Sequence, residues 1–446
     1  MLPLLLIILF CVLGVITGIA TGLLPGLHVN NVAIIFLSLS GAIVGAFSFL
    51  LQYGISEQFI LILICVYIIS TSISHTFHDS IPTTFLGAPE ENTALSVLPA
   101  HSLLLEGKGY EAVALAALGS YGAIIFCFLI LYPIRFIIGT PLLFYSTLRE
   151  IMLWVLIAIS LLMIMTEKGR IDVFGKCGKL PSMVGILFAA FLFFLSGLFG
   201  LAITNISLNS PIGLPAPVLF PALAGLFGTP TLLTSLMTKP KIPRQKIEQP
   251  RFDKKAKKAS ILSVLTGSFA GILVSIIPGI TSATGTIIAM STRAESNKRQ
   301  TIITLSAVNT ACAFFVVAIL FILLRARSGV TLAIADLITV EEWTAFTMPA
   351  TLIYLLIAVL LSGTLSYFLV LKIGKTFAKH FANIPYALLI KLTIAMIITL
   401  VLLFTSITGL LILIVATFIG LIPIHWGVRR SHCMGILLIP VILYFL

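Results

Sequence analysis

Charged residues are scarce in this sequence. Only 9% of its 446 residues are Asp, Glu, Lys or Arg, whereas 59% are hydrophobic. A soluble protein carries about a quarter charged residues, so the composition excludes a soluble globular fold. A helix needs about 20 apolar residues to span a membrane, and it satisfies its own backbone polar groups along the way. The chain is therefore predicted to be an all-α polytopic membrane protein with roughly 10 to 12 membrane elements.

Catalytic signatures are missing. The sequence contains no H-E-x-x-H, G-x-S-x-G, Walker A or G-x-G-x-x-G motif, which mark metalloproteases, hydrolases, nucleotide-hydrolysing proteins and dinucleotide enzymes. The chain is therefore not expected to be an enzyme, and no cofactor is predicted. A gradient of Na⁺ or H⁺ is then the simplest source of energy for any work on a solute.

Paired cysteines are lacking too. The six cysteines show no C-x-x-C spacing, and five of them lie in apolar runs. They are expected to be packing residues, with no disulfide framework and no metal site. These cysteines are Cys11, Cys65, Cys127, Cys177, Cys312 and Cys433.

One phrase occurs twice. Gly14-x3-Gly18-x6-Pro25-Gly26 returns as Gly267-x3-Gly271-x6-Pro278-Gly279, with an offset of 253 residues at all four positions. Each copy lies in an apolar stretch, where Pro must interrupt a helix because it lacks an N–H and clashes with the preceding turn. Two matching breaks predict a substrate site at the interface of two halves.

The basic residues lie in the loops. The net charge of +12 is explained by cytoplasmic loops rich in Lys and Arg, so no nucleic acid partner is expected. The strongest loop, 239–258, holds nine Lys and Arg against Glu248 and Asp253. It is interpreted as a solvated linker near anionic lipid, and a regulatory or partner-binding role is the alternative. The predicted division is a first half at 1–238, a linker at 239–260 and a second half at 261–446.

Loop charge also predicts the topology. Residues 2–24 lack a basic n-region and are too long for a signal peptide, so they are read as a retained helix in a multi-pass cell-membrane protein. With the N-terminus outside, the hairpin of 4–24 and 29–51 opens from outside and that of 261–290 from inside, which makes the halves inverted-topology repeats. The predicted crossing segments are 59–74, 110–132, 146–165, 184–208, 218–237, 302–324, 346–371, 388–404 and 407–423, with a partial helix at 433–446.

Polar clusters follow both breaks. A helix that restarts there points free N–H groups and the positive end of its dipole at the break, which favours an anion. Simple capping of the restarted helix is the alternative. The predicted substrate-binding residues are Pro25, Gly26, His28, Asn30 and Asn31 in the first copy, and Pro278, Gly279, Thr281, Ser282 and Thr284 in the second.

The densest polar stretch is 74–93. Its Pro and Gly content predicts an irregular backbone that returns to the cytoplasmic side. Such backbone at membrane depth must line a cavity or be buried, and ionisable groups there are usually functional. His75, His78, Asp79, Glu90 and Glu91 are therefore candidates for ion or proton coupling. The alternatives are a loop in water and a metal site built from His75-x2-His78-Asp79.

Further polar residues occur in the second half. Asn309 and Thr310 interrupt an apolar run. They are predicted to bind the solute, and an interhelical hydrogen bond is the alternative. Arg325 and Arg327 would attract anions from outside or snorkel at a helix end.

The combined motifs resemble those of a known family. The two Pro-Gly phrases, the run around Ile81-Pro82-Thr83 and Gly87-Ala88-Pro89, and the stretches 98–112 and 306–311 resemble the large membrane subunit of tripartite tricarboxylate transporters, in particular its archaeal relatives that occur alone. The resemblance covers most of the chain.

The resemblance implies uptake of a small carboxylate driven by Na⁺ or H⁺, with a small membrane subunit and an extracellular solute-binding protein as partners. A homo-oligomer is left open. The family's binding loops map onto Pro25, Gly26, His28 and Asn30, onto Thr83, Thr84, Gly87 and Pro89, and onto Pro278, Gly279, Thr281 and Asn309.

The sequence departs from the family at two places. Glu90 and Glu91 stand where the family has small neutral residues, and Arg325-Ala326-Arg327 lacks the usual Pro-Gly. These departures bear on whether the solute is citrate and on whether a binding protein is needed. Three other functions compete with the transporter. A lipid-phosphate translocase would show a lateral opening lined by Arg135, Arg149 or Arg325. An intramembrane metal-dependent enzyme would bring His75, His78 and Asp79 together, and a channel would show a continuous polar path.

Overall fold

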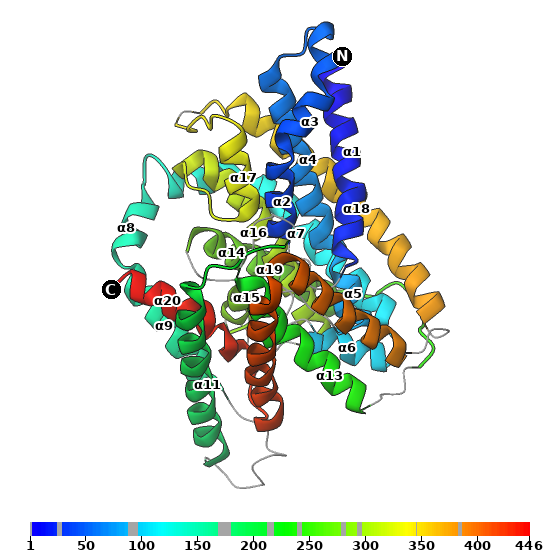
Figure 1. Cartoon of the computed structure of the whole chain (residues 1–446), viewed down its shortest axis with the longest axis vertical. Helices are drawn as coiled ribbons and strands as arrows, with labels where there is room; N and C mark the ends of the chain where they lie inside the picture. The colour runs from blue at the N-terminus through cyan, green and yellow to red at the C-terminus, as the bar shows by residue number, and fades with distance from the viewer. Residues whose placement is uncertain are drawn as a thin grey trace.

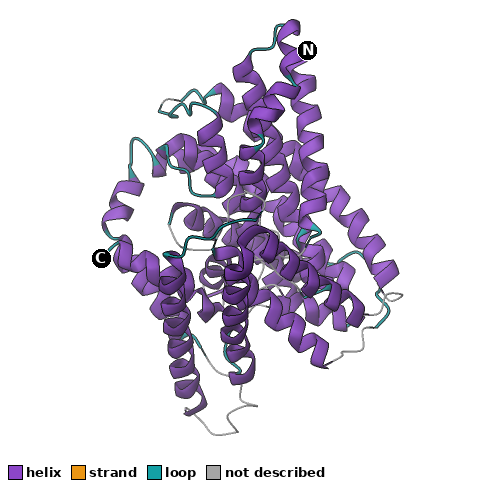
Figure 2. Cartoon of the chain, viewed as in Figure 1, coloured by secondary structure: helices purple, strands orange, loops and turns teal. Residues whose placement is uncertain are grey.

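Helices make up every regular element of the described chain (Figure 2). The structure is a computed structural model, and it describes all residues except 1, 25–28, 88–96, 168–179, 212–217, 239–242, 278–281, 292–296, 345 and 382–385. No strand occurs in that part of the chain. The predicted all-α membrane fold is confirmed.

Helices cover the predicted crossing segments of the first half, but the segment 146–165, predicted as one crossing, is bent by 70° between two helices. The first half has the following helical elements. They are α1 (Leu2–Gly22), α2 (Val29–Ser38), α3 (Ser40–Ala46), η1 (Ser48–Tyr53), α4 (Glu57–His78), α5 (Ser80–Phe85), α6 (Val97–Leu105), α7 (Gly109–Ile138), α8 (Phe144–Glu150), α9 (Met152–Met165), α11 (Leu180–Thr204), α12 (Leu219–Leu223), the π-helical turn η3 (Ala224–Gly228) and α13 (Thr229–Thr238).

The second half repeats the hairpin and then runs through longer helices (Figure 1). They are α14 (Lys254–Ile276), α15 (Ser282–Ser291), α16 (Lys298–Leu323), α17 (Gly329–Leu337), α18 (Ala350–Phe381), α19 (Tyr386–Trp426), η4 (Arg430–Met434) and α20 (Gly435–Tyr444). Helix α19 covers the two predicted segments 388–404 and 407–423, and Ser406 interrupts it with φ of 59°.

Membrane-crossing length recurs along the chain. Nine helices of the described ranges are long and apolar enough to cross a bilayer, and the bent pair α8 and α9 makes ten if it counts as one span. The short arms α2 and α15 come in addition. The number fits the predicted range of membrane elements.

Close glycine contacts pair α1 with α4 in the first half and α14 with α16 in the second. A Cβ on Gly14 would lie 2.6 Å from the Tyr67 carbonyl oxygen, and one on Gly18 would lie 2.5 Å from that of Thr71. Helices in a membrane associate by such close packing of small residues. The glycines of the repeated phrase therefore hold α1 against α4 (Figure 1).

The second copy packs in the same way. A Cβ on Gly267 would lie 2.6 Å from the Thr304 carbonyl oxygen, and one on Gly271 would lie 2.5 Å from that of Val308. Thr304 and Val308 stand 237 positions after Tyr67 and Thr71, so α16 meets α14 at the positions where α4 meets α1. The first half has 16 more residues than the second between its hairpin and α4, and they form part of α3 and η1.

The two halves also contact each other in matching pairs. Helix α16 packs against α7, and α4 packs against α18. One continuous apolar core includes residues from α1 to α20. Helices α4 and α16 are therefore central in their halves, and they supply the site described below.

One predicted arm is wrong. Residues 29–51 were expected to form a single returning arm, but the helix breaks at Leu39 and again at Phe47. The extra residues of the first half account for this, because they must be folded into short helices beside α4.

Candidate functional site

The stretch that follows residue 74 is helical. Helix α4 continues through His78, and after Asp79 the chain forms α5 up to Phe85. The prediction of an irregular backbone is wrong for residues 75–85. Pro82 lies in the first turn of α5, where a helix needs no N–H, and the polar side chains face protein. The alternative of a loop in water is wrong as well, because every residue of 75–85 is buried.

A small enclosed cavity lies between this segment and α16. Its volume is about 10 Å³, about what one water molecule needs. First-half residues from α4 to α7 line one side, and α16 lines the other. The lining residues are Thr76, Asp79, Ser80, Thr84, Ala100, Ala112, Ala116, Ile302, Leu305, Ser306 and Asn309.

The polar atoms in this cavity are mainly oxygens. Asp79 is 4% exposed, and Thr84 and Asn309 are also buried. A carboxylate, hydroxyls and an amide oxygen are the donor set that hard cations prefer. A dehydrated Na⁺ ion or a water molecule would fit the space, whereas a carboxylate solute would not.

The second hairpin reaches the cavity through Asn309. The Ser282 hydroxyl, at the start of α15, donates to Oδ1 of Asn309 at 3.3 Å. Ser282 in turn accepts from the Thr286 hydroxyl through its carbonyl oxygen. The hairpin and the cavity therefore share one side chain. Thr310 faces elsewhere, and its buried hydroxyl has no hydrogen-bond partner among the described residues.

The histidines face the first hairpin. Nδ1 of His75 lies 3.1 Å from the hydroxyl of Thr21, in the last turn of α1. Nδ1 of His78 lies 2.7 Å from the Ser74 carbonyl oxygen. Since a carbonyl only accepts, this nitrogen carries the proton and Nε2 is a bare acceptor. Nε2 is buried and has no hydrogen-bond partner among the described residues.

Two other candidates have backbone roles. The Thr83 hydroxyl donates to the Asp79 carbonyl oxygen at 2.7 Å. Gly87 has φ of 66°, which a residue with a side chain rarely adopts. Thr83 and Gly87 therefore stabilise the end of this segment and do not line the cavity.

Several predicted residues lie outside the described ranges or are described by backbone alone. Asn30 and Asn31 are in the first turn of α2, and Thr284 is in α15. The residues outside the described part are Pro25, Gly26, His28, Pro89, Glu90, Glu91, Pro278, Gly279 and Thr281.

Three polar cavity residues, Thr76, Ser80 and Ser306, were not predicted from the sequence. Thr76 lies three positions before the predicted Asp79 and four before Ser80, so these residues share one helix face, and Ser306 precedes Asn309 by one turn. That spacing was readable. It was overlooked because the segment was treated as irregular.

The metal hypothesis gains no support from geometry. Within the described ranges no group of three His, Cys, Asp or Glu side chains is placed to hold a metal ion. His75 and His78 both turn toward helix residues, as described above.

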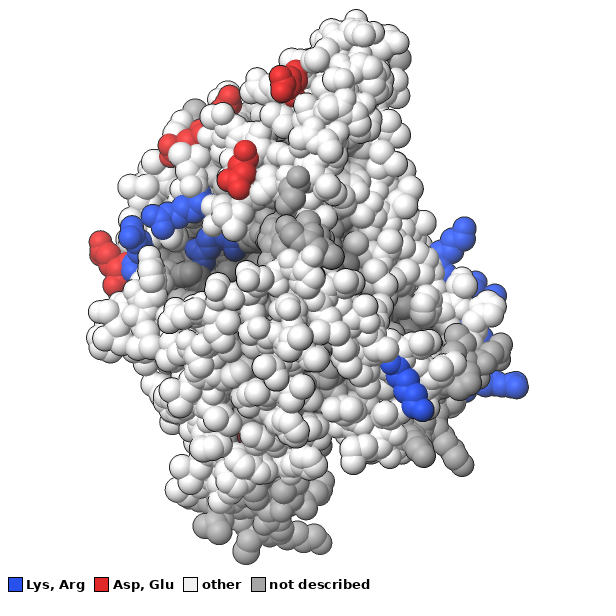
Figure 3. Space-filling model, viewed as in Figure 1, with Lys and Arg blue, Asp and Glu red and all other residues white. Residues whose placement is uncertain are grey.

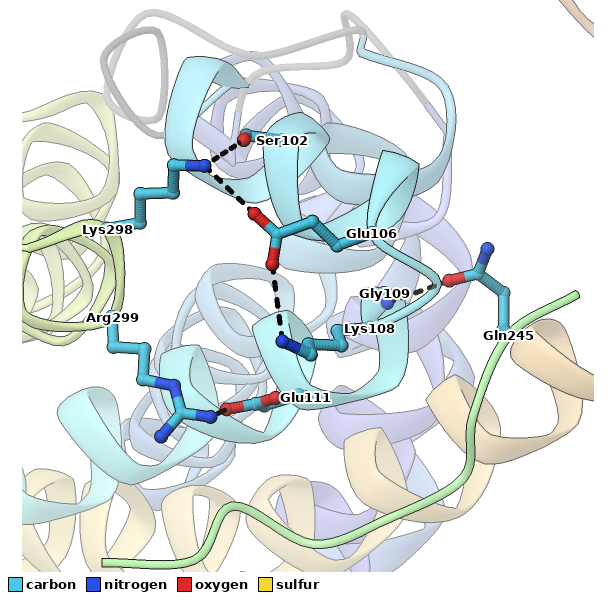
Figure 4. Close-up of polar contacts among 8 residues, drawn as sticks. All are labelled: Ser102, Glu106, Lys108, Gly109, Glu111, Gln245, Lys298 and Arg299. Atoms are coloured by element: carbon cyan, nitrogen blue, oxygen red, sulfur yellow. Dashed lines mark hydrogen bonds and ion pairs between the residues drawn. The ribbon is translucent and has the colours of Figure 1, made fainter. Parts of the chain in front are cut away.

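Ion pairs join the two halves at the basic end of α16 (Figure 4). Nζ of Lys298 lies 2.9 Å from a Glu106 oxygen and 2.5 Å from the Ser102 hydroxyl. Arg299 lies 2.5 Å from the Glu111 carboxylate. The chain before α14 joins in, because the Gln245 side chain accepts from the Gly109 N–H at 2.8 Å. We call these contacts the basic-end latch.

Glu106 makes the latch pH-dependent. Lys298 and Lys108 hold the pKa of its carboxyl below the ordinary value of 4.5. A depressed carboxyl pKa stabilises the folded state above the unfolded pKa, and the contribution is lost as pH falls through the folded pKa. The latch should therefore be intact at neutral pH and weaken in acid.

The two ion pairs of the latch should differ in strength. Arg299→Gln leaves the Glu111 side chain, which is 10% exposed, without its partner, so we expect a loss of about 1–3 kcal/mol. Lys298→Gln breaks a solvent-exposed pair and should cost less than about 1 kcal/mol. Thermal unfolding of the purified variants checks this. Equal effects would contradict the assignment of the stronger pair to Glu111.

Comparison with known proteins gives two matches. The model of the tripartite tricarboxylate transporter TctA family matches residues 8–435. Uncharacterized protein MJ1079 of Methanocaldococcus jannaschii is 30% identical over 430 residues, which cover 95% of this chain and 94% of that protein. No solved structure matches the chain. The matched residues include both hairpins and the cavity.

Proposed function

The chain belongs to the tripartite tricarboxylate transporter TctA family, and from this premise we propose that it is an ion-coupled secondary transporter of a small organic anion, such as a di- or tricarboxylate. It is a multi-pass membrane protein of a transporter family. The plasma membrane is the proposed location, with the N-terminus outside and the basic loops in the cytoplasm.

The observation that carries this proposal is the cavity between the halves. It buries the Asp79 carboxylate at the boundary of two bodies that must move apart in alternating access. A buried ionisable group inside a membrane is costly and usually functional. We assign the cavity to the coupling ion, with Asp79 as the charged ligand and Asn309 as the ligand from the second half.

His78 supports H⁺ as the other coupling ion. Its Nε2 is a buried acceptor, and a proton taken up there would add a charge next to α1. The two ions are distinguishable, because a Na⁺ site needs the oxygens around Asp79 whereas a proton site needs the imidazole. Glu90 and Glu91 remain proposed coupling residues.

The anion is proposed to bind at the hairpin breaks. Helices α2 and α15 begin directly after them, and their N-terminal N–H groups and dipoles favour an anion. The proposed ligands are the residues predicted from the sequence, Pro25, Gly26, His28, Asn30 and Asn31, and Pro278, Gly279, Thr281, Ser282 and Thr284. Asn309 belongs to the ion cavity and contacts the start of α15 through the Ser282 hydroxyl.

The family is the large subunit of a tripartite system, so a small membrane subunit and a solute-binding protein are the kinds of partner expected. We propose that the solute-binding protein docks on the side away from the linker. The departures from the family at Glu90, Glu91 and Arg325 to Arg327 leave open whether this chain needs it.

A lipid-phosphate translocase is the second candidate. Arg135 gives it no support, because the guanidinium is buried and donates to the carbonyl oxygens of Trp343 at 2.8 Å and Thr140 at 2.8 Å. Arg149 and Arg325, however, line an open hollow. Two arginines in an open hollow favour a phosphate headgroup as a second candidate ligand.

Uptake into proteoliposomes tests the function. We expect labelled citrate or succinate to accumulate at least 10-fold over empty liposomes under an imposed Na⁺ or H⁺ gradient, and to stop when the gradient is collapsed. No accumulation under either gradient, together with flipping of a polyprenyl phosphate, would replace the proposal with the translocase.

Substitutions at the breaks should weaken transport. Asn30→Ala or Thr281→Ala removes a donor to a charged solute, a loss of about 1.5–3 kcal/mol, so KM should rise roughly 10- to 150-fold. Ser210→Ala is the control, since its hydroxyl only donates to the Leu403 carbonyl oxygen on the surface. Equal effects of all three would show that the hairpin tips are only structural.

A further inference from the structure

A hollow opens at the end of α16 away from the basic-end latch. Its volume is about 480 Å³, which is enough for a small organic solute. Its lining comes from α8, the end of α16 and the loop after it. The residues are Tyr145, Ser146, Arg149, Glu150, Leu323 and Arg325. Basic side chains gather beside a hollow near α8 on the left of the space-filling view (Figure 3).

Tyr145 fixes the position of Arg325. The guanidinium donates to the tyrosine hydroxyl at 3.2 Å and lies 5.3 Å from the ring centroid. Arg149 contributes a second positive charge. In the described part of the chain, neither arginine forms an ion pair with a carboxylate, although Glu150 also lines the hollow. The two arginines against Glu150 leave the lining with a net charge of +1.

Arg327 connects the hollow with the second hairpin. Its guanidinium donates to the carbonyl oxygen of Ile276, the last residue of α14 before the Pro-Gly break. Burial lowers the pKa of the Arg327 guanidinium, Tyr145 and Cys312 raise it, and Arg325 lowers it. Arg327 thus lies within electrostatic reach of the residues that line the hollow.

The loop that bears both arginines is fixed at each end. Thr331 accepts from the N–H of Arg327 at 2.9 Å and forms a capping box with Ser328. Helix α17, which follows, packs against α2 of the first hairpin. The loop is therefore connected to the end of α14 through Arg327 and to α2 through α17. An arginine offers five N–H donors in a plane that suits a carboxylate, and Ile276 uses only part of that capacity.

We propose that Arg325 and Arg327 form an anion relay, which receives a solute with two or more carboxylates at the hollow and delivers it to the second hairpin. The inference rests on the proposed function for the identity of the cargo as an organic anion. Two guanidiniums select against a single carboxylate because they leave one charge unpaired. The proposal commits to a solute carboxylate and not to a lipid headgroup, and the experiment below separates the two.

Transport of citrate, succinate and acetate by variants tests the relay. We expect Arg327→Gln to raise the KM for citrate at least 30-fold, with a smaller rise for succinate and little change for acetate. Arg327→Lys keeps the charge and should recover most of the loss. Arg325→Gln should raise the citrate KM about 5-fold and remove part of its dependence on ionic strength. Arg251→Gln, on the exposed chain before α14, is the matched control and should stay within 2-fold.

The outcomes separate the relay from the proposed function. Citrate uptake by the wild type with unchanged KM in Arg325→Gln and Arg327→Gln would overturn the relay and leave the proposed function standing. If the wild type transports no carboxylate, the proposed function fails, and calorimetry of citrate binding decides the relay. Binding that Arg327→Gln weakens supports it, and equal binding overturns it. Competition by a polyprenyl phosphate at the hollow would also overturn it.

Folding does not obscure the result. Arg327→Gln removes a contact to Ile276, so loss of the folded state is detected by thermal unfolding. Arg325 is exposed and its side chain contacts only Tyr145 among the polar contacts described. A KM effect of Arg325→Gln that scales with the number of carboxylates cannot arise from a packing defect, and its absence overturns the relay.

Discussion

Asp79→Asn is expected to abolish gradient-driven accumulation, by 100-fold or more, in protein that thermal unfolding shows to be folded. The amide has the same shape but no charge, so a cation would lose its only carboxylate ligand among the residues that line the cavity. Thermal unfolding of the same preparation separates loss of the cation ligand from loss of the folded state.

The matched control for this change is Asp336→Asn. It makes the same chemical substitution at an exposed position in α17, and uptake should stay within 2-fold of the wild type. Uptake, exchange and thermal unfolding are measured on the same preparations. Accumulation by Asp79→Asn within 3-fold of the wild type would remove the cavity from the coupling mechanism and move attention to His78.

Gly18→Ala and Gly271→Ala are expected to give large losses of stability. A Cβ at either position would lie 2.5 Å from a backbone carbonyl oxygen of the neighbouring helix, so the two helices must move apart. Overpacking of this kind costs about 1–3 kcal/mol, and here the atom it meets is backbone that cannot rotate away. Both variants should unfold at lower temperature, and part of the purified protein should aggregate in detergent solution.

Gly41→Ala in α3 is the control for these variants. A Cβ there would meet nothing within 4 Å, and replacing an exposed helical Gly by Ala stabilises by up to about 1 kcal/mol. The same substitution should therefore have opposite signs at positions 18 and 41. A stable Gly18→Ala protein would show that α1 does not pack on α4 as described.

Much of the helix arrangement follows from the sequence. The repeated Gly-x3-Gly phrase predicts that α1 and α14 are corresponding helices of the two halves. In both of them the glycines pack closely against a neighbouring helix, α4 or α16. The start of α15 at Ser282 lies just past the second break, as the Pro-Gly step predicts. Periodicity and loop charge were enough there, because each helix is one apolar run.

The site was less readable. The Pro and Gly content of the polar stretch 74–93 predicted an irregular backbone, whereas residues 75–85 are buried and helical. Contacts over long separations leave no local signal. Arg135 has its main partner at Trp343, 208 positions away, and Lys298 meets Glu106 across 192 positions.

The ends of α16 are unlike each other in a way that sets a direction. Lys298 and Arg299 seal one end through the latch, while the other end opens into a hollow. In this structure the N-terminal end of α16 is closed by ion pairs, and its C-terminal end lines an open hollow. A compound that binds in the hollow should stabilise this conformation. A carboxyl-modifying reagent should then react more slowly with Glu106, because the ion pair with Lys298 stays closed.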